Sequence, residues 1–468
     1  MKDNHLIKTL LLPALVIAGL LLLYYIPEIT LFGEEPLRKI DILSDVKRKT
    51  YTPSEAEKLI AEAEAERKKL LGKDSIFPGV IPIEDFSQDS LRMMDSFYDA
   101  LNKAKQLNRP VRIAYFGDSF IGCDILTCDL RDMLQTRFGG CGVGAIDLVS
   151  PSSRPTIVQT DKNLTSHLPT KPKKFKAELQ GMNSVYTTCE GEGKAKITGS
   201  TYRYKQHTDK WDTSLLYFRP TDKTVVKCAI NGGKAQNLYS GKDSKLQVVK
   251  AEGEIRTVEW TLEGKGSTFF FAANESKKGV ILDNFGIVSA RGTHLQYIPL
   301  TTLQEFAAIR DYDLIVFQYG LNVTNDQGKY QSYSESFDKV LANFHKAWPK
   351  ASLMLVSVSD RCKGNNGGQP TTMKGIEELV IAQRNIARKN KVAFWNLFSA
   401  MGGRGGIAKM VADGDASKDF THMAYSGGKK LADKLYNAMM NGLYNYNVRQ
   451  KANTKINEKV NNIKEITR

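Results

Sequence analysis

Short apolar stretches alternate with helical patterns in two separated parts of the chain. The stretches lie at 113–116, 314–319, 352–358 and 392–395. Continuous apolar strands separated by helices are typical of a parallel sheet that is covered by helices on both faces. We therefore expect a three-layer α/β domain encoded in two parts, residues 85–154 and 281–445.

The pattern changes between these two parts. Segments in which polar and apolar residues alternate are separated by turns such as Asn231-Gly232-Gly233. The segments lie at 195–198, 214–218, 224–228, 245–249, 257–260 and 268–271. Repeated short strands with such turns predict an antiparallel β-sandwich inserted over residues 155–280.

The N-terminus contains an uncharged apolar run from Thr9 to Ile26, preceded by Lys2 and Lys8. Its length is about that of a membrane-spanning helix, and Tyr24 and Tyr25 lie where interfacial aromatic residues are common. The pattern favours a transmembrane signal anchor over residues 1–27 rather than a cleaved signal peptide or a buried helix. The positive N-terminal side predicts a single pass through the inner membrane, with the C-terminal domain in the periplasm.

Polar segments flank the α/β domain. Residues 28–84 are expected to form a tether and a charged helix, which begins with the capping box Thr52-Pro53-Ser54-Glu55. A closing helix is predicted over 426–440. The basic tail, 446–468, is expected to be loosely ordered.

Composition excludes several classes of function. The net charge is +15, but no nucleic-acid motif is present, so we expect either a solvated basic surface or attraction to an anionic cell wall or lipid. The six cysteines and six histidines do not form a zinc-type spacing. The glycine-rich loop at 138–144 lacks the Lys-Ser/Thr ending of a phosphate-binding loop. No metal, organic cofactor or nucleic acid is expected.

Three short motifs follow predicted strands or precede the closing helix: Gly117-Asp118-Ser119, Gly320-Leu321-Asn322 and Asp419-Phe420-Thr421-His422. Alone, each motif is typical of an ordinary turn or helix cap. The carboxyl ends of parallel strands meet at one crevice, however, so we expect the three motifs to converge.

The residue types in these motifs are the parts of a nucleophilic triad. Ser119 would be the nucleophile, His422 the base, and Asp419 the residue that orients the imidazole; Asp413 and Asp415 are rival partners for His422. The Ser119 N–H and the Asn322 amide would stabilise an oxyanion.

The order Gly-Asp-Ser, Gly-x-Asn, Asp-x-x-His resembles the SGNH (GDSL-type) hydrolases. The stretch 109–124 is similar to a membrane-anchored branch of Bacteroidetes type, and the inserted sandwich is similar to the layout of peptidoglycan O-acetylesterases. The resemblance implies a flavodoxin-like sheet. It also implies a second oxyanion donor from the segment 283–292, where Ser289 occupies the place of a family glycine and Gly292 is an alternative.

The resemblance implies a membrane-tethered serine esterase that removes acetyl or other acyl groups from an envelope polysaccharide such as peptidoglycan. The inserted sandwich could bind carbohydrate. Two alternatives stay open: an O-acetyltransferase that uses the same acyl-serine, and a non-catalytic glycan-binding protein. The polymer and the oligomeric state are not determined by the sequence.

Overall fold

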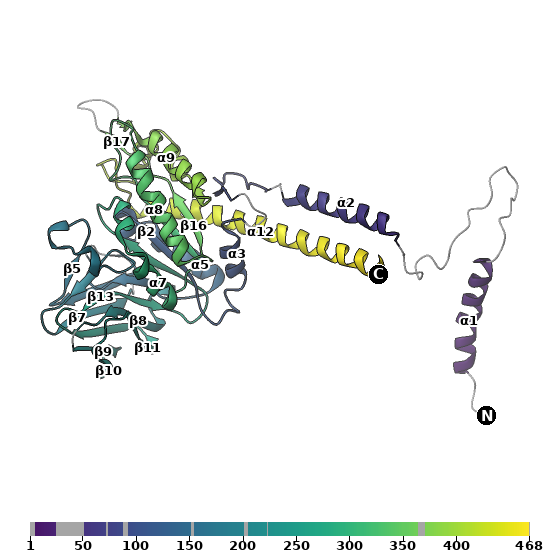
Figure 1. Ribbon diagram of the computed structural model, residues 1–468, viewed down its shortest axis with the longest axis horizontal. Coiled ribbons are helices and arrows are strands. Elements are labelled where there is room, and N and C mark those ends of the chain that lie inside the picture. Colours follow the sequence, from purple (N-terminus) through teal and green to yellow (C-terminus); the bar gives the residue numbers. More distant parts are fainter. Residues whose placement is uncertain are drawn as a thin grey trace. The chain divides into compact units, whose positions relative to one another are not determined.

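The computed structural model describes residues 5–24, 51–71, 74–87, 92–150, 154–200, 205–221, 223–363 and 370–467. The chain divides into two compact units (Figure 1). The larger comprises Asp74–Asn447, and the smaller comprises Met1–Lys73 together with Val448–Arg468.

A parallel sheet forms the centre of the larger unit, with the strand order β1-β19-β16-β15-β2-β14. The strands are β1 (Glu84–Asp85), β2 (Val111–Gly117), β14 (Val280–Gly286), β15 (Leu314–Gln318), β16 (Ser352–Val356) and β19 (Ala393–Trp395). β1 pairs antiparallel with β19, and the other strands are parallel. The parallel strands have the flavodoxin-like order that the resemblance implies. The chain adds β14 on one side of β2 and then adds β15, β16 and β19 on the other side, so the strand order reverses at β2.

Helices cover both faces of this sheet. They are α3 (Asp95–Asn102), α5 (Thr127–Phe138), α7 (Leu300–Ile309), α8 (Gln331–Ala347), α9 (Ile376–Lys389) and α12 (Tyr425–Thr467). α7, α8 and α9 pack in one layer. On the other face α12 packs closely on α3, since a Cβ at Gly442 would lie 1.9 Å from the hydroxyl of Tyr98.

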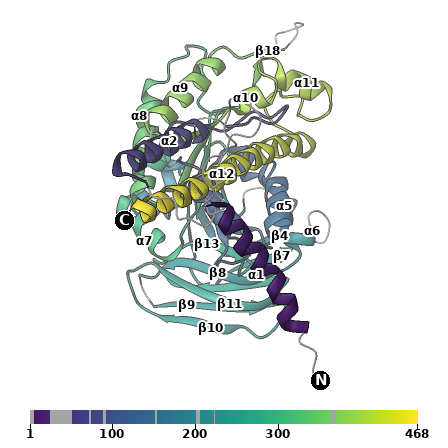
Figure 2. The same ribbon diagram turned by 90° about the vertical axis from the view of Figure 1, so that its right-hand side faces the viewer.

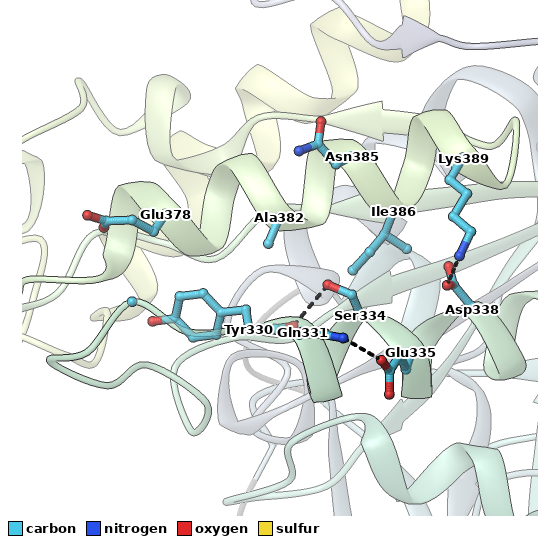
Figure 3. A pocket seen from close by; sticks show the side chains of 11 residues that line it. Tyr330, Gln331, Ser334, Glu335, Asp338, Glu378, Ala382, Asn385, Ile386 and Lys389 are labelled. Carbon is cyan, nitrogen blue, oxygen red and sulfur yellow. Dashed lines mark hydrogen bonds and ion pairs between the residues drawn. The ribbon is translucent and has the colours of Figure 1, made fainter.

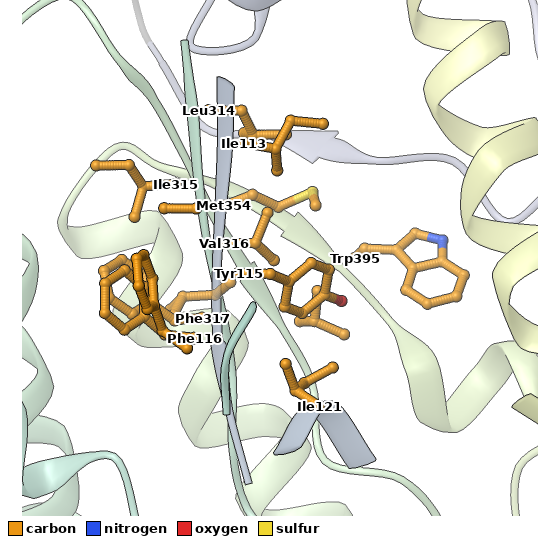
Figure 4. Packing of buried hydrophobic residues seen from close by; sticks show 14 of the residues in the cluster. Ile113, Tyr115, Phe116, Ile121, Leu314, Ile315, Val316, Phe317, Met354 and Trp395 are labelled. Atoms are coloured by element: carbon orange, nitrogen blue, oxygen red, sulfur yellow. The ribbon is translucent and has the colours of Figure 1, made fainter. Parts of the chain in front are cut away.

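The core explains why the strands have nearly continuous apolar sequences. Phe116 and Phe317 stack with ring centroids 5.4 Å apart, and Phe344 of α8 meets both rings edge-on. Tyr115 and Val316 point to the opposite face of the sheet (Figure 4). Both faces are therefore dry, which a strand with polar alternation could not provide.

The insert forms two antiparallel sheets, β10-β9-β12-β7-β4 and β11-β8-β13-β6-β5, and β3 pairs with β13. The strands are β3 (Gly144–Asp147), β4 (Ile157–Lys162), β5 (Thr165–His167), β6 (Tyr186–Thr188), β7 (Gly193–Gly199), β8 (Trp211–Arg219), β9 (Thr224–Ile230), β10 (Gln236–Gly241), β11 (Gln247–Ile255), β12 (Thr257–Glu263) and β13 (Thr268–Glu275). β8, β9, β10 and β11 lie together at one end of the unit (Figure 2). Trp211 and Trp260 are fully buried in the core of the sandwich.

The remaining elements are short. They are α4 (Ser119–Gly122), α6 (Lys205–Thr208), α10 (Leu397–Ala400), α11 (Gly406–Ala412), β17 (Cys362–Lys363), β18 (Thr371–Thr372), η1 (Pro172–Lys174), η2 (Ala177–Leu179) and η3 (Thr293–Tyr297).

A buried ionic network joins the insert to the α/β sheet. Arg310 is fully buried and contacts Asp283 of β14 at 2.7 Å and Glu275 of β13 at 2.9 Å. Burial raises the pKa of Glu275, but Arg310 and Arg112 outweigh this effect and lower it to about 2. Glu275 thus stays ionised and paired with Arg310 at the junction.

The smaller unit contains α2 (Pro53–Leu71) and the end of α12. The predicted capping box is confirmed, since Glu55 N–H donates to Thr52 Oγ1 at 3.3 Å and Thr52 N–H donates to Glu55 Oε2 at 2.9 Å. The tail expected to be loosely ordered is instead helical to Thr467. Ile456 and Val460, one helical turn apart, bury themselves against Ala63 of α2.

The N-terminal membrane anchor requires a correction. α1 (His5–Tyr24) is a helix that contains Pro13. No helix among the described residues is long and apolar enough to span a membrane, so the predicted transmembrane helix is wrong. His5 and Lys8 occupy the first turns of the helix, so the uncharged part of the described helix is shorter than the roughly 20 residues that a bilayer requires. The predicted tether lies almost entirely outside the described residues.

The buried network predicts a large loss of stability in Arg310→Met. The substitution leaves Asp283 and Glu275 buried without their cation, which should lower the free energy of unfolding by about 3–5 kcal/mol. Urea unfolding measures the change. The control is Arg404→Met, because Arg404 pairs with Glu377 while 64% of its side chain is exposed, and such a pair contributes about 0–1 kcal/mol. Equal losses in both variants would contradict the role of the network.

Candidate functional site

Ser119 is the first residue of α4, directly after β2. Gly117 is required there, since a Cβ would lie 2.3 Å from Ile121 Cγ1. Asp118 caps the helix: its carboxylate accepts from Phe120 N–H at 3.2 Å, and its carbonyl accepts from the N–H groups of Ile121 and Gly122. The first N–H groups of a helix lack partners within it. Among the described residues, the N–H of Ser119 has no hydrogen-bond partner and is available to a ligand.

The Asp118 carboxylate also connects the first motif to the second. It is buried and accepts from the backbone N–H of Leu321 in the Gly320-Leu321-Asn322 segment. Burial raises the pKa of Asp118 to about 7, against the hydrogen bonds from Phe120 and Leu321 and the charge of His422, which lower it. The influence of His422 shows that the third motif reaches the same place.

His422 and Asp419 form the pair expected from the sequence. Asp419 Oδ2 lies 2.7 Å from His422 Nδ1, and Asp419 Oδ1 accepts from the backbone N–H groups of Thr421 and His422, both at 2.9 Å. Burial raises the pKa of Asp419, but the hydrogen bonds from His422 and Thr421 outweigh it and lower the pKa. A proton on Nδ1 leaves Nε2 as the acceptor, which is the tautomer that a general base needs.

The two rival carboxylates do not pair with the imidazole. Asp415 instead forms an ion pair with Lys430. The described structure places no contact between Asp413 and His422, and the backbone N–H of Asp413 closes a turn of α11 on Lys409. Asp419 is therefore the partner of His422.

The His422 loop is held next to the Ser119 helix by the start of α12. Tyr425 donates its hydroxyl hydrogen to Cys123 O at 3.0 Å, and a Cβ at Gly428 would lie 2.2 Å from Ile125 O. No hydrogen bond joins Ser119 Oγ to His422 in the described chain. Such catalytic hydrogen bonds are often long without substrate and shorten when it binds.

Two of the candidate oxyanion donors, Asn322 and Ser289, are linked through Ala290. Asn322 Nδ2 donates to Ala290 O at 3.0 Å, which fixes the amide and leaves its second N–H unassigned. Ser289 has φ of 65°, the left-handed conformation that favours glycine. Ser289 therefore has the backbone conformation of the glycine that the resemblance expects at this position. Gly292 has a packing role, since a Cβ there would lie 2.6 Å from Tyr319 and 2.7 Å from Phe337.

One positioning residue was not identified from the sequence. Asn284 of β14 donates to Ile121 O at 2.6 Å and to Thr127 Oγ1 at 2.9 Å, and it accepts from Gly286 N–H at 3.1 Å. It thereby fixes α4 against the end of β14. In the sequence, the only signal for this role is an amide side chain within a largely apolar strand, two residues before Gly286.

The structure also contains a groove that lies away from these residues. It has a volume of about 460 Å³ and is formed between α8 and α9 (Figure 3). Asp338 and Lys389, which form an ion pair at 2.6 Å, lie at one end of it. None of the site residues predicted from the sequence lines this groove in the described structure.

No protein-family model and no curated protein sequence matches the chain. Among solved structures, a peptidoglycan O-acetylesterase matches with a TM-score of 0.64 and 18% identity, covering 77% of this chain and 99% of that one. A G-D-S-L family lipolytic protein from Desulfitobacterium hafniense (11% identity, 34% and 81% of the two chains, TM-score 0.25) also matches. So does a family two carbohydrate esterase from Clostridium thermocellum (9% identity, 55% and 93%, TM-score 0.25).

The two matches with a TM-score of 0.25 are too weak to show a shared fold. The match with 18% identity shows the fold but not the function. The match with the O-acetylesterase extends over nearly all of that enzyme and most of this chain. The chain therefore shares the fold of this peptidoglycan O-acetylesterase, the class of protein whose layout the sequence resembles.

Proposed function

We propose that the protein is a serine esterase that removes O-acyl groups, acetyl in the simplest case, from a carbohydrate polymer. The observation that supports this most directly is the 2.7 Å contact between His422 and Asp419 at the strand edge from which the Ser119 helix begins. A capped nucleophile helix, a tautomer-fixed imidazole and candidate oxyanion donors at Ser119, Asn322 and Ser289 meet the requirements for acyl transfer.

In the first half of the reaction, Ser119 Oγ attacks the acyl carbon while His422 Nε2 takes the hydroxyl proton. Asp419 stabilises the resulting imidazolium. The tetrahedral intermediate collapses when the C–O bond to the sugar breaks, and His422 returns the proton to the departing sugar oxygen. The acyl group is then bonded to Ser119.

In the second half, water attacks the acyl-serine, and His422 accepts a water proton and passes it to Ser119 Oγ. The products are the free acid and the regenerated hydroxyl. The side chains of His422 and Asp419 are 48% and 47% exposed. Water therefore has direct access to the base, which favours hydrolysis over transfer of the acyl group to a second sugar.

Peptidoglycan is the polymer that we propose, because the O-acetylesterase with the same fold is a peptidoglycan enzyme and aligns over nearly its full length. A peptidoglycan substrate requires a location in the cell envelope outside the cytoplasm. This location is a prediction that follows from the substrate.

The triad predicts a graded loss of activity in three variants of the full-length chain. Ser119→Ala and His422→Ala should each lower kcat on the order of 10⁶-fold, and Asp419→Ala about 10⁴-fold, because the imidazole still functions partly without its carboxylate. Acetate released from O-acetylated peptidoglycan and from p-nitrophenyl acetate is the measurement.

Asp413→Ala is the matched control, since it removes a nearby carboxylate that does not contact His422. It should retain wild-type rates. Wild type and Ser119→Ala releasing acetate equally slowly would refute the esterase proposal. Faster acyl transfer to an added chito-oligosaccharide than to water would identify a transferase instead.

The oxyanion donors predict opposite outcomes for two substitutions. Asn322→Ala removes a side-chain donor and should lower kcat about 10²–10³-fold with little effect on KM. Ser289→Gly keeps the backbone N–H and suits the φ of 65°, so its kcat should stay near wild type. Steady-state kinetics on p-nitrophenyl acetate tests both. A large loss in Ser289→Gly would show that the serine hydroxyl itself, rather than the N–H, is required.

A further inference from the structure

A groove of about 320 Å³ lies beside the candidate active site, between the end of β14 and the insert. One wall contains Gly286, Ile287, Val288 and Ser289, and the other contains Leu168, Thr170 and Lys171. A Cβ on Gly286 would lie 2.1 Å from Gly122 N, so this wall touches the helix that begins with Ser119. A molecule in the groove would lie directly beside Ser289, one of the candidate oxyanion donors.

The groove also contains Asp147, the last residue of β3. Asp147 is only 7% exposed. Its Oδ1 accepts from Asn183 Nδ2 at 2.9 Å, and within the described chain its Oδ2 receives no hydrogen bond. A buried carboxylate normally has all its acceptor positions satisfied, because desolvation is costly. The Oδ2 atom is therefore free to accept a hydrogen bond from a molecule in the groove.

The residue that holds Asp147 is incompletely bonded as well. Asn183 is buried, and its Oδ1 has no hydrogen-bond partner in the described structure. Burial raises the pKa of Asp147 to about 6, opposed by Arg154 and by the hydrogen bond from Asn183. The carboxyl group is therefore mostly ionised at neutral pH and remains an acceptor.

We infer that this groove is the subsite for a saccharide unit of the polymer, with Asp147 accepting a hydrogen bond from a sugar hydroxyl or amide. Leu168, Ile287 and Val288 provide an apolar wall that fits the C–H face of a pyranose ring. Lys171, exposed at the rim, can donate to a sugar oxygen or carboxylate. This assignment deepens the proposed esterase function and rests on it for the identity of the polymer.

The subsite explains why the insert occurs at this position in the chain. Asp147 belongs to a strand that pairs with β13 of the insert, opposite Phe271. Leu168, Thr170 and Lys171 follow β5, another strand of the insert. The insert thus contributes one wall of the groove and the catalytic sheet contributes the other, so the saccharide would be held at a fixed position relative to Ser119.

The test is calorimetric binding of chitotetraose to full-length protein that carries Ser119→Ala to prevent turnover. Asp147→Asn should weaken binding about tenfold to a hundredfold, the usual effect of losing a hydrogen bond to a charged group. Thr170→Trp, at an exposed position where a large ring is tolerated by the fold, should block the groove and weaken binding at least as much. Lys234→Ala, in the exposed turn between β9 and β10, is the control and should bind as the parent does.

A second measurement, with Ser119 intact, compares kcat/KM on O-acetylated peptidoglycan and on p-nitrophenyl acetate. Both groove variants should lose at least tenfold more activity on the polymer than on the small ester, because only the polymer occupies the groove. Undetectable chitotetraose binding by the parent, unchanged binding in both groove variants, or equal losses on the two esters would overturn the subsite. Binding that depends on Asp147 without any acetate release by the wild-type enzyme would keep the subsite and refute the esterase.

Discussion

The buried carboxylate of Asp118 is the point on which the candidate site depends. It caps α4 through Phe120 N–H, accepts from the backbone of Leu321 and lies within the electrostatic reach of His422. A carboxylate in such a place is costly unless several donors surround it. The donors here come from two of the three sequence motifs, and the charge comes from the third. Folding around this group therefore brings the three motifs together, although they are about two hundred and one hundred residues apart in the sequence.

The parts of the fold that depend on local pattern could be predicted from the sequence. Apolar runs such as 314–319 marked the buried strands, and the switch to polar alternation marked the insert. The parallel strand order then placed Ser119, Asn322 and His422 at the same edge without knowledge of any contact. Capping chemistry is equally local, and Thr52 and Glu55 bond as expected.

Features that depend on distant partners could not be predicted. The helicity of the final residues depends on Ala63, nearly four hundred positions earlier, against which Ile456 packs. The pairing of Arg310 with Glu275 and Asp283 joins two domains of different pattern.

The apolar N-terminal run illustrates a different limit: hydropathy alone predicted a membrane span, but no described helix meets the length and apolarity that a span requires. The choice of Asp419 over Asp415 also needed the structure, because it depends on Lys430 binding the rival.

The insert contributes to the site through rigidity as well as through the groove. Arg310 is bonded to a strand of the insert and to a strand of the catalytic sheet, and both carboxylates are buried. Because a buried pair of this kind is strongly destabilised when one partner is displaced, the two sheets cannot shift independently at low energy. Asp147 and Ser289 lie on opposite sides of this junction and face the same groove. A rigid junction keeps their separation constant, so under the proposed function a saccharide bound in the groove would present its ester at a defined position to Ser119. Positional control of that kind lowers the barrier by orienting the reacting groups before the chemical step. In the proposed esterase, it would also separate the residues that select the polymer from those that cleave the ester.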